Sequence, residues 1–166
     1  MGLVTEGVLR APLHRVDPRA RWYWAASASV RWLVLIGIEL AIWFSRSHPS
    51  DMHAVLLTIT IALALVHLTV MPQWRYFVHR WEGTETALYT RSGWITQELR
   101  IAPIARIQTI DTHRGPIEQL FGLANVTVTT ASAAGPLKIH GLTLAAADRL
   151  VGELTERTQT AGDDAT

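Results

Sequence analysis

Two long apolar segments in the first half of the chain constrain the fold more than any other feature. The first runs over about residues 25–44 and the second over about residues 52–71. Each holds about 20 residues, which at a helical rise of about 1.5 Å matches a hydrocarbon core of about 30 Å. The short link between them, SRSHPSD, makes the two helices antiparallel neighbours. We therefore expect a transmembrane helical hairpin over residues 22–73.

Two other interpretations of these segments are open. A cleaved signal peptide has a shorter apolar run and a small-residue cleavage site before a soluble region, whereas here a second apolar segment follows directly. A buried helical pair of a soluble protein is the other alternative. The second segment argues against it, because that segment is apolar on all faces.

The distribution of arginine predicts how the hairpin crosses the membrane. Positive residues concentrate on the cytoplasmic side of membrane proteins. The flank at residues 1–21 and the segment after the second span are rich in arginine, whereas the link carries only Arg46. We therefore expect both termini in the cytoplasm and the link outside.

Three ionisable residues fall within the spans. Arg31 can extend its long side chain to the cytoplasmic interface, and His67 lies at nearly the same depth on the returning helix. Glu39 lies near the middle of the membrane, level with Thr58 and Thr60. Its carboxyl group is expected either to bond to a threonine hydroxyl of the hairpin or to contact another subunit or partner.

The second half of the chain, residues 74–158, has the pattern of a small β-rich domain. Runs of β-branched and aromatic residues recur between turn residues, beginning with a strand at Tyr76–Trp81, and they predict about six strands. A closing helix is expected at Leu144–Thr158, with an apolar stripe that packs on the sheet. Residues 159–166 are expected to be a disordered tail. The expected fold is mainly β, or α+β: an antiparallel bent sheet or partly open barrel, capped by the C-terminal helix.

The stretch from Ile101 to Ala131 resembles the signature of bacterial pleckstrin-homology-like (PH domain) membrane proteins. The matching elements are Pro103, the pair Ile107–Gln108, Gly115–Pro116, the run Phe121–Ala124, and Thr130–Ala131. Small members of that family have two transmembrane helices before one such domain, as here. The resemblance implies a PH-like fold at the inner face of the cytoplasmic membrane. It implies no particular activity.

No catalytic, cofactor or metal-binding motif is apparent. The chain has no cysteine, which excludes disulfides and thiolate chemistry. No two histidines have the spacing of a helical metal motif. His79, His113 and His140 could approach one another and Asp111 only through the fold. With a net charge of +1 the chain has no nucleic-acid footprint. We expect no enzyme, no cofactor and no nucleic-acid partner.

These observations favour a membrane-anchored interaction or scaffold module that binds a protein partner or self-associates. The alternative is a module that senses anionic lipid headgroups, and a third interpretation is an accessory subunit of a membrane enzyme or transporter. Within the domain, basic residues and a Gly-Pro loop supply the candidate contacts with a partner or with lipid: Arg75, Arg80, Arg106, His113, Arg114 and Glu118.

Overall fold

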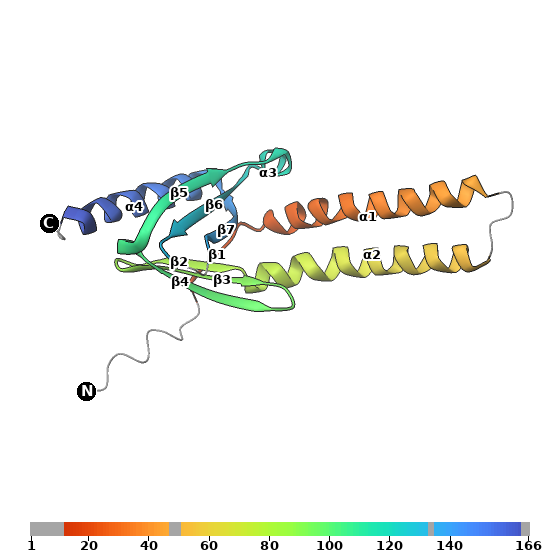
Figure 1. Ribbon diagram of the computed structural model, residues 1–166, viewed down its shortest axis with the longest axis horizontal. Helices are drawn as coiled ribbons and strands as arrows, with labels where there is room; N and C mark the ends of the chain where they lie inside the picture. Colours follow the sequence, from red (N-terminus) through yellow and green to blue (C-terminus); the bar gives the residue numbers. More distant parts are fainter. Residues whose placement is uncertain (1–11, 47–50, 133–134, 164–166) are drawn as a thin grey trace, which may run out of the picture.

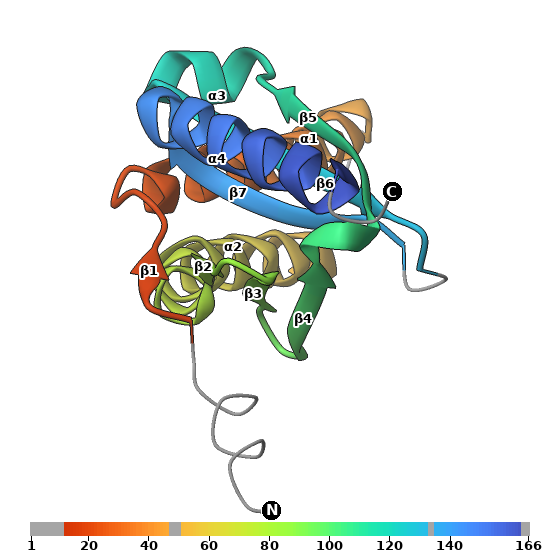
Figure 2. The same ribbon diagram turned by 90° about the vertical axis from the view of Figure 1, so that its left-hand side faces the viewer.

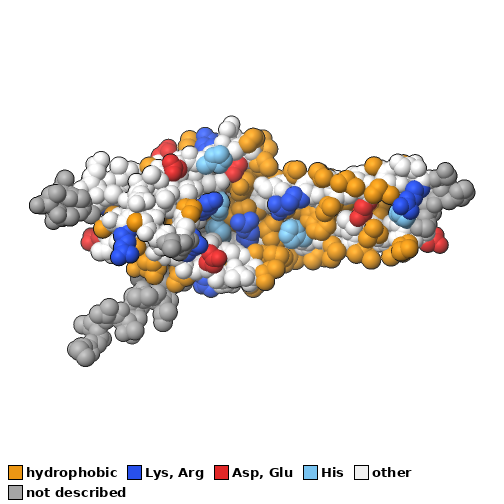
Figure 3. All heavy atoms as spheres, in the orientation of Figure 1, with side chains coloured by type: hydrophobic (Ala, Val, Ile, Leu, Met, Phe, Trp, Pro, Cys, Tyr) orange, Lys and Arg blue, Asp and Glu red, His pale blue; other side chains and the backbone are white. Residues whose placement is uncertain are grey.

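Two antiparallel helices project from one end of a small β-rich domain (Figure 1). The computed structural model describes residues 12–46, 51–132 and 135–163. Helix α1 spans Ala20–Ser45 and helix α2 spans Asp51–Val78, and both are long and apolar enough to cross a membrane. Only 6% of the most apolar stretch of α1 and 17% of that of α2 is buried. Apolar side chains therefore cover the outside of the hairpin (Figure 3), as lipid contact requires.

Two side-chain hydrogen bonds join the helices within their apolar length. Trp32 Nε1 donates to His67 Nδ1 over 2.9 Å, and the Thr60 hydroxyl donates to Glu39 Oε1 over 2.8 Å. Of the two arrangements expected for Glu39, the internal hydrogen bond is thus present. A contact of Glu39 with another subunit stays a prediction.

Helix α2 continues further toward the domain than the apolar pattern suggests. Its last residues, Tyr76 to Val78, were expected to begin the first strand, but that strand, β2, is Arg80–Gly83. The aromatic residues at this point pack as helical side chains: Tyr76 joins the apolar cluster at the base of the hairpin, and the Arg21 guanidinium lies 5.0 Å from its ring centre. This tertiary packing overrides the preference of aromatic residues for strands.

The domain consists of two antiparallel sheets that do not close into a barrel. One has the order β1-β2-β3-β4 and the other the order β5-β6-β7. The remaining elements are β1 His14–Arg15, β3 Ala87–Gly93, β4 Gln97–Pro103, η1 Ile104–Arg106, β5 Ile107–His113, α3 Pro116–Phe121, β6 Leu123–Thr130, β7 Leu137–Thr143 and α4 Leu144–Asp163. The expected open, antiparallel PH-like fold is confirmed. Strand β1 was not foreseen, because two residues show no alternation, and α4 extends through part of the expected disordered tail.

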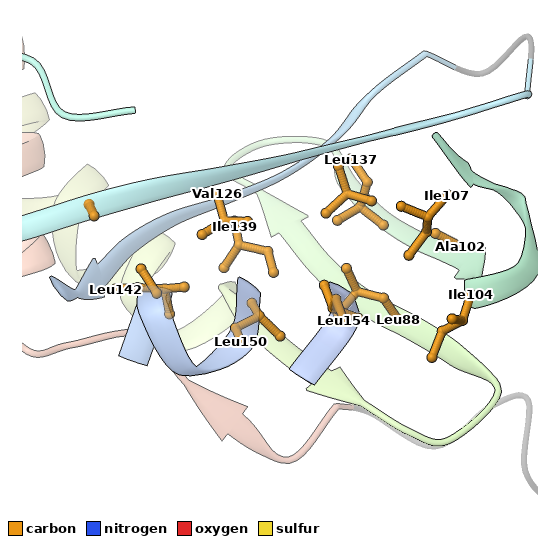
Figure 4. Packing of buried hydrophobic residues seen from close by; sticks show 13 residues of the cluster. Leu88, Ala102, Ile104, Ile107, Val126, Leu137, Ile139, Leu142, Leu150 and Leu154 are labelled. Carbon is orange, nitrogen blue, oxygen red and sulfur yellow. The ribbon is translucent and has the colours of Figure 1, made fainter. Parts of the chain in front are cut away.

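The core of the domain lies between the two sheets and α4. Figure 2 shows α4 lying across the domain on the side away from the hairpin. Its stripe of Ala147, Leu150 and Leu154 is at most 2% exposed and packs against residues from both sheets, such as Leu88 and Ile139 (Figure 4). The predicted packing of this helix on the sheets is therefore correct.

A second apolar cluster joins the hairpin to the domain. Trp24 and Ala28 of α1 pack with Met71 of α2 and with Leu123 of β6, and all four are at most 5% exposed. Because residues of the hairpin and of the domain bury one another here, the two parts form a single packed unit.

A buried hydrogen-bond network reinforces this junction. The Tyr23 hydroxyl and Asn125 Nδ2 each donate to Glu118 Oε1 over 2.8 Å. Asn125 Oδ1 in turn accepts from the Gly141 backbone N–H over 3.0 Å. The network thereby connects α1, α3, β6 and β7 around one carboxylate.

Replacing Gly141 tests the closeness of the junction. Gly141 has a φ of 78°, and a Cβ there would lie 2.6 Å from the Cβ of Ala20. Gly135 has a φ of 77° but open space around it, so Gly135→Ala is a matched control for backbone strain. Gly141→Ala should lower the free energy of unfolding by about 1–3 kcal/mol more than Gly135→Ala, the usual cost of overpacking. Chemical unfolding in detergent, followed by tryptophan fluorescence, measures both. Equal losses would contradict the close packing.

Replacing Glu118 tests the buried network. Glu118→Leu leaves the donors of Tyr23 and Asn125 without their acceptor, at a cost of about 1–3 kcal/mol for each donor that stays buried. Glu118→Gln keeps a carbonyl oxygen in place and serves as the control. In detergent, the thermal midpoint of the leucine variant should lie several degrees below that of the glutamine variant. If the two midpoints coincide, the network does not stabilise the fold.

Candidate functional site

A cleft of about 370 Å³ opens between the β3–β4 hairpin and β7, beside the last turn of α2. This volume is in the range of small-molecule sites, roughly 300–1,000 Å³. Figure 3 shows Lys, Arg and His side chains near the junction of the domain with the helices. We call this the interface cleft, and its lining residues include Arg75, His79, Thr90, Ser92, Glu98, Arg100, Lys138 and His140.

Three cationic side chains converge on the interface cleft from three separate elements. Arg75 comes from α2, Arg100 from β4 and Lys138 from β7. One carboxylate is also present: Glu98 Oε2 lies 3.3 Å from Arg100 Nε. The Arg75 guanidinium lies 4.7 Å from the ring centre of Trp24, and no carboxylate among the described residues pairs with it. The cations therefore outnumber the acids in this cleft.

Two histidines lie side by side in the wall of the cleft. The rings of His79 and His140 are 6.1 Å apart. Burial, with the nearby charge of Arg75, lowers the pKa of His79 to about 3 and that of His140 to about 4, so both are neutral at pH 7. His79 is 3% exposed, and among the described residues neither of its ring nitrogens has a hydrogen-bond partner. A buried polar group without a partner is rare in folded proteins.

The β3–β4 turn, which forms one wall of the cleft, reaches back along α2. Trp94 in this turn lies 5.4 Å from the ring of His67, about three helical turns before the end of α2. Trp74 Nε1 also donates to the Trp94 carbonyl over 2.9 Å. Ile95 at the tip is 83% exposed. The cleft therefore lies at the membrane-proximal end of the domain.

The predicted contact residues do not gather at one site. Arg75 lines the interface cleft, whereas Arg80 lies beside a hollow formed with Trp74 and Phe77 on another face. Arg106 in η1 and His113 at the end of β5 are exposed and belong to neither region. No common ligand can therefore contact this whole set.

The Gly-Pro loop uses its polar groups inside the fold. Arg114 Nε donates to the Leu123 carbonyl over 3.1 Å. Glu118 is only 8% exposed and belongs to the buried network. Burial alone would raise the pKa of Glu118, but hydrogen bonds from its own backbone N–H, Tyr23 and Asn125 outweigh it and hold that pKa below the usual value. These contacts stabilise the loop and leave few polar groups for a partner.

The three ionisable residues of the spans also have separate environments. His67 accepts from Trp32, and Glu39 accepts from Thr60. Arg31 is exposed on α1, where its side chain can extend toward the interface. They form no common polar site within the hairpin.

A second candidate surface is the outer side of the four-stranded sheet. Successive strand residues point to opposite faces, so Tyr89 and Arg91, which alternate with buried Leu88 and Thr90, point outward. Leu99 is 45% exposed and pairs with Arg91, while Ile101 is 43% exposed and pairs with Tyr89. We define the outer sheet face as these residues with their neighbours on β2 and α2: Trp74, Phe77, Arg80, Tyr89, Arg91, Leu99 and Ile101.

Sequence reasoning missed most of the cleft. His79, Arg100 and the pair Lys138 and His140 come from three distant parts of the chain, and no spacing rule connects these parts. The available signal was alternation: Lys138 and His140 are two residues apart on a strand and so share a face. Among the described residues, no three His, Asp or Glu side chains form a group that could hold a metal ion.

Comparison with known proteins identifies the family of this chain. Residues 28–158 match the family model described as "Bacterial PH domain". The chain is also 25% identical over 157 residues to the UPF0699 transmembrane protein YdbS of Bacillus subtilis (strain 168), covering 92% of this chain and 97% of that protein. No solved structure matches the chain. The matched region contains most of the hairpin and strands β2 to β7, and the resemblance noted at Ile101–Ala131 is confirmed: the chain belongs to the bacterial PH domain family.

Proposed function

We propose that this protein is a membrane-anchored, non-enzymatic interaction module that presents its PH-like domain at the inner face of the cytoplasmic membrane. The hairpin anchors the domain, and the shared apolar cluster with Trp24 and Leu123 holds it in one orientation. A domain fixed in this way loses little rotational freedom when it binds a partner, which favours association.

The observation that carries this proposal is the outer sheet face. It combines half-exposed apolar residues, Leu99 and Ile101, with aromatic and arginine side chains. Aromatic residues and arginine are enriched at protein–protein interfaces and among the residues that dominate binding energy. The outer edge of β4 also pairs with no other strand among the described residues, and an extended segment can dock on such an edge. A protein partner or a second copy of the chain fits this surface.

General attraction to anionic lipid is the alternative function. Each arginine near an anionic surface contributes about 1 kcal/mol of attraction. Arg75 and Arg80 lie near the base of the hairpin, whereas Arg106 and Arg114 lie apart from them, so the arginines named from the sequence support attraction in general and not one shared site.

Cysteine labelling tests the proposed orientation. A cysteine at Ser47, in the link between the spans, should react with a membrane-impermeant maleimide added to intact cells. A cysteine at Ser132, in the domain, should react only after the cells are lysed, because the proposed orientation has both termini in the cytoplasm. Since the chain has no natural cysteine, the parent protein is the unlabelled control. The reverse pattern would show that the domain lies outside.

Site-directed photocrosslinking in cells tests the outer sheet face. A photoreactive residue at Leu99 should give a discrete crosslinked product, which mass spectrometry identifies as a partner or a second copy. The same residue at Thr109, exposed on β5 away from this face, is the matched control. In a protein that also carries Ile101→Arg, the Leu99 product should fall severalfold, because a charge enters the apolar contact. No product at Leu99, or equal products at both positions, would contradict the proposal.

A further inference from the structure

We propose that the interface cleft binds a phosphate group, and that an anionic phospholipid headgroup supplies it. The site lies on the opposite side of the sheet from the outer sheet face, since Thr90 and Arg100 point inward where Tyr89 and Arg91 point outward. This inference therefore stands or falls independently of a protein partner on the outer sheet face.

The charge and donor content of the cleft fit a phosphate. Arg75, Arg100 and Lys138 supply cationic donors, and charge-assisted hydrogen bonds from such groups to phosphate are the strong ones. Arg75 and Lys138 have no carboxylate partner among the described residues, so these two charges are free to bind a ligand. Arg100 shares its charge with Glu98 and also donates to the Pro136 carbonyl over 2.9 Å, which fixes its position at the rim.

The histidines support a ligand at the same place. A neutral imidazole carries one N–H donor and one acceptor, and both nitrogens of His79 lack a partner among the described residues. The Thr90 and Ser92 side chains line the same cleft as this pair of histidines. A phosphate has enough acceptor oxygens to serve several of these donors at once.

The position of the cleft identifies the source of the phosphate. Arg75 belongs to the same helix that crosses the membrane, and the turn that forms one wall of the cleft contacts His67 within that helix. Ile95 in this turn is exposed, and Trp74 of α2 donates to the Trp94 carbonyl of the same turn. Tryptophan prefers the headgroup region of a bilayer. A lipid of the inner leaflet can thus place its phosphate in the cleft and keep its acyl chains beside α2.

Thermal unfolding of the full-length protein in a zwitterionic detergent tests the site. Short-chain phosphatidylglycerol should raise the unfolding midpoint in a saturable way, and short-chain phosphatidylcholine should raise it less. Arg100→Ala and Lys138→Ala should each weaken the response to phosphatidylglycerol about tenfold, as expected for the loss of one charge-assisted bond. Lys138→Arg should retain it. Arg106→Ala removes an exposed arginine outside the cleft and is the matched control.

The possible results separate the sources of the ligand. A response to inorganic phosphate as large as that to phosphatidylglycerol, and lost in the same variants, would support the anion site but overturn the lipid as its source. Equal responses to both lipids, or a phosphatidylglycerol response unchanged in Arg100→Ala and Lys138→Ala, would overturn the proposal. Lys138 is exposed, so Lys138→Ala should unfold at the parent midpoint without lipid, and a weaker response to phosphatidylglycerol in this variant then reports lost binding and not lost stability.

Discussion

The apolar cluster between hairpin and domain is the contact on which the other features depend. Trp24 packs against residues of both helices and of the domain, and Gly141 lets β7 approach α1 closely enough for this packing. Without the cluster, the domain would be joined to the membrane by a short connection and could turn freely. With it, Arg75 of α2 and His140 of β7 line the same cleft. The packing of the hairpin on the domain therefore forms the cleft together with the PH-like fold.

Strand alternation then assigns the charges of one sheet to two separate surfaces. Arg91 and Arg100 lie on the paired strands β3 and β4, yet Arg91 is on the outer sheet face and Arg100 is in the cleft. Arg91 pairs with Leu99 and Arg100 with Thr90, and successive residues of a strand point to opposite faces of the sheet. A count of arginines over the domain cannot show this division. Nearly balanced charge overall is compatible with one face suited to a protein and one cleft suited to an anion, since local grouping decides what binds.

Helices whose residue pattern lies within one segment could be predicted from the sequence. Contacts between residues that are far apart in the chain could not. The spans are continuous apolar runs and α4 carries an apolar stripe, so the type of all three helices and the buried face of α4 were evident. The end of α2 was missed because tertiary packing around Tyr76 decided between helix and strand. Glu118 was expected at the surface because its loop is polar, but it is the acceptor for Tyr23 and Asn125 across three elements. Such pairings have no local signal.

The cleft also depends on contacts of polar groups within the hairpin. Trp32 donates to His67, and the His67 ring also lies 5.4 Å from the ring of Trp94 in the β3–β4 turn. A side chain that is costly to place in lipid thereby contacts two aromatic rings, one from the hairpin and one from the domain. The β3–β4 hairpin that carries Trp94 also carries Ser92 and Thr96, which line the cleft. Packing inside the membrane thus helps to position a wall of the cleft, so a shift between the two helices would change the shape of the site.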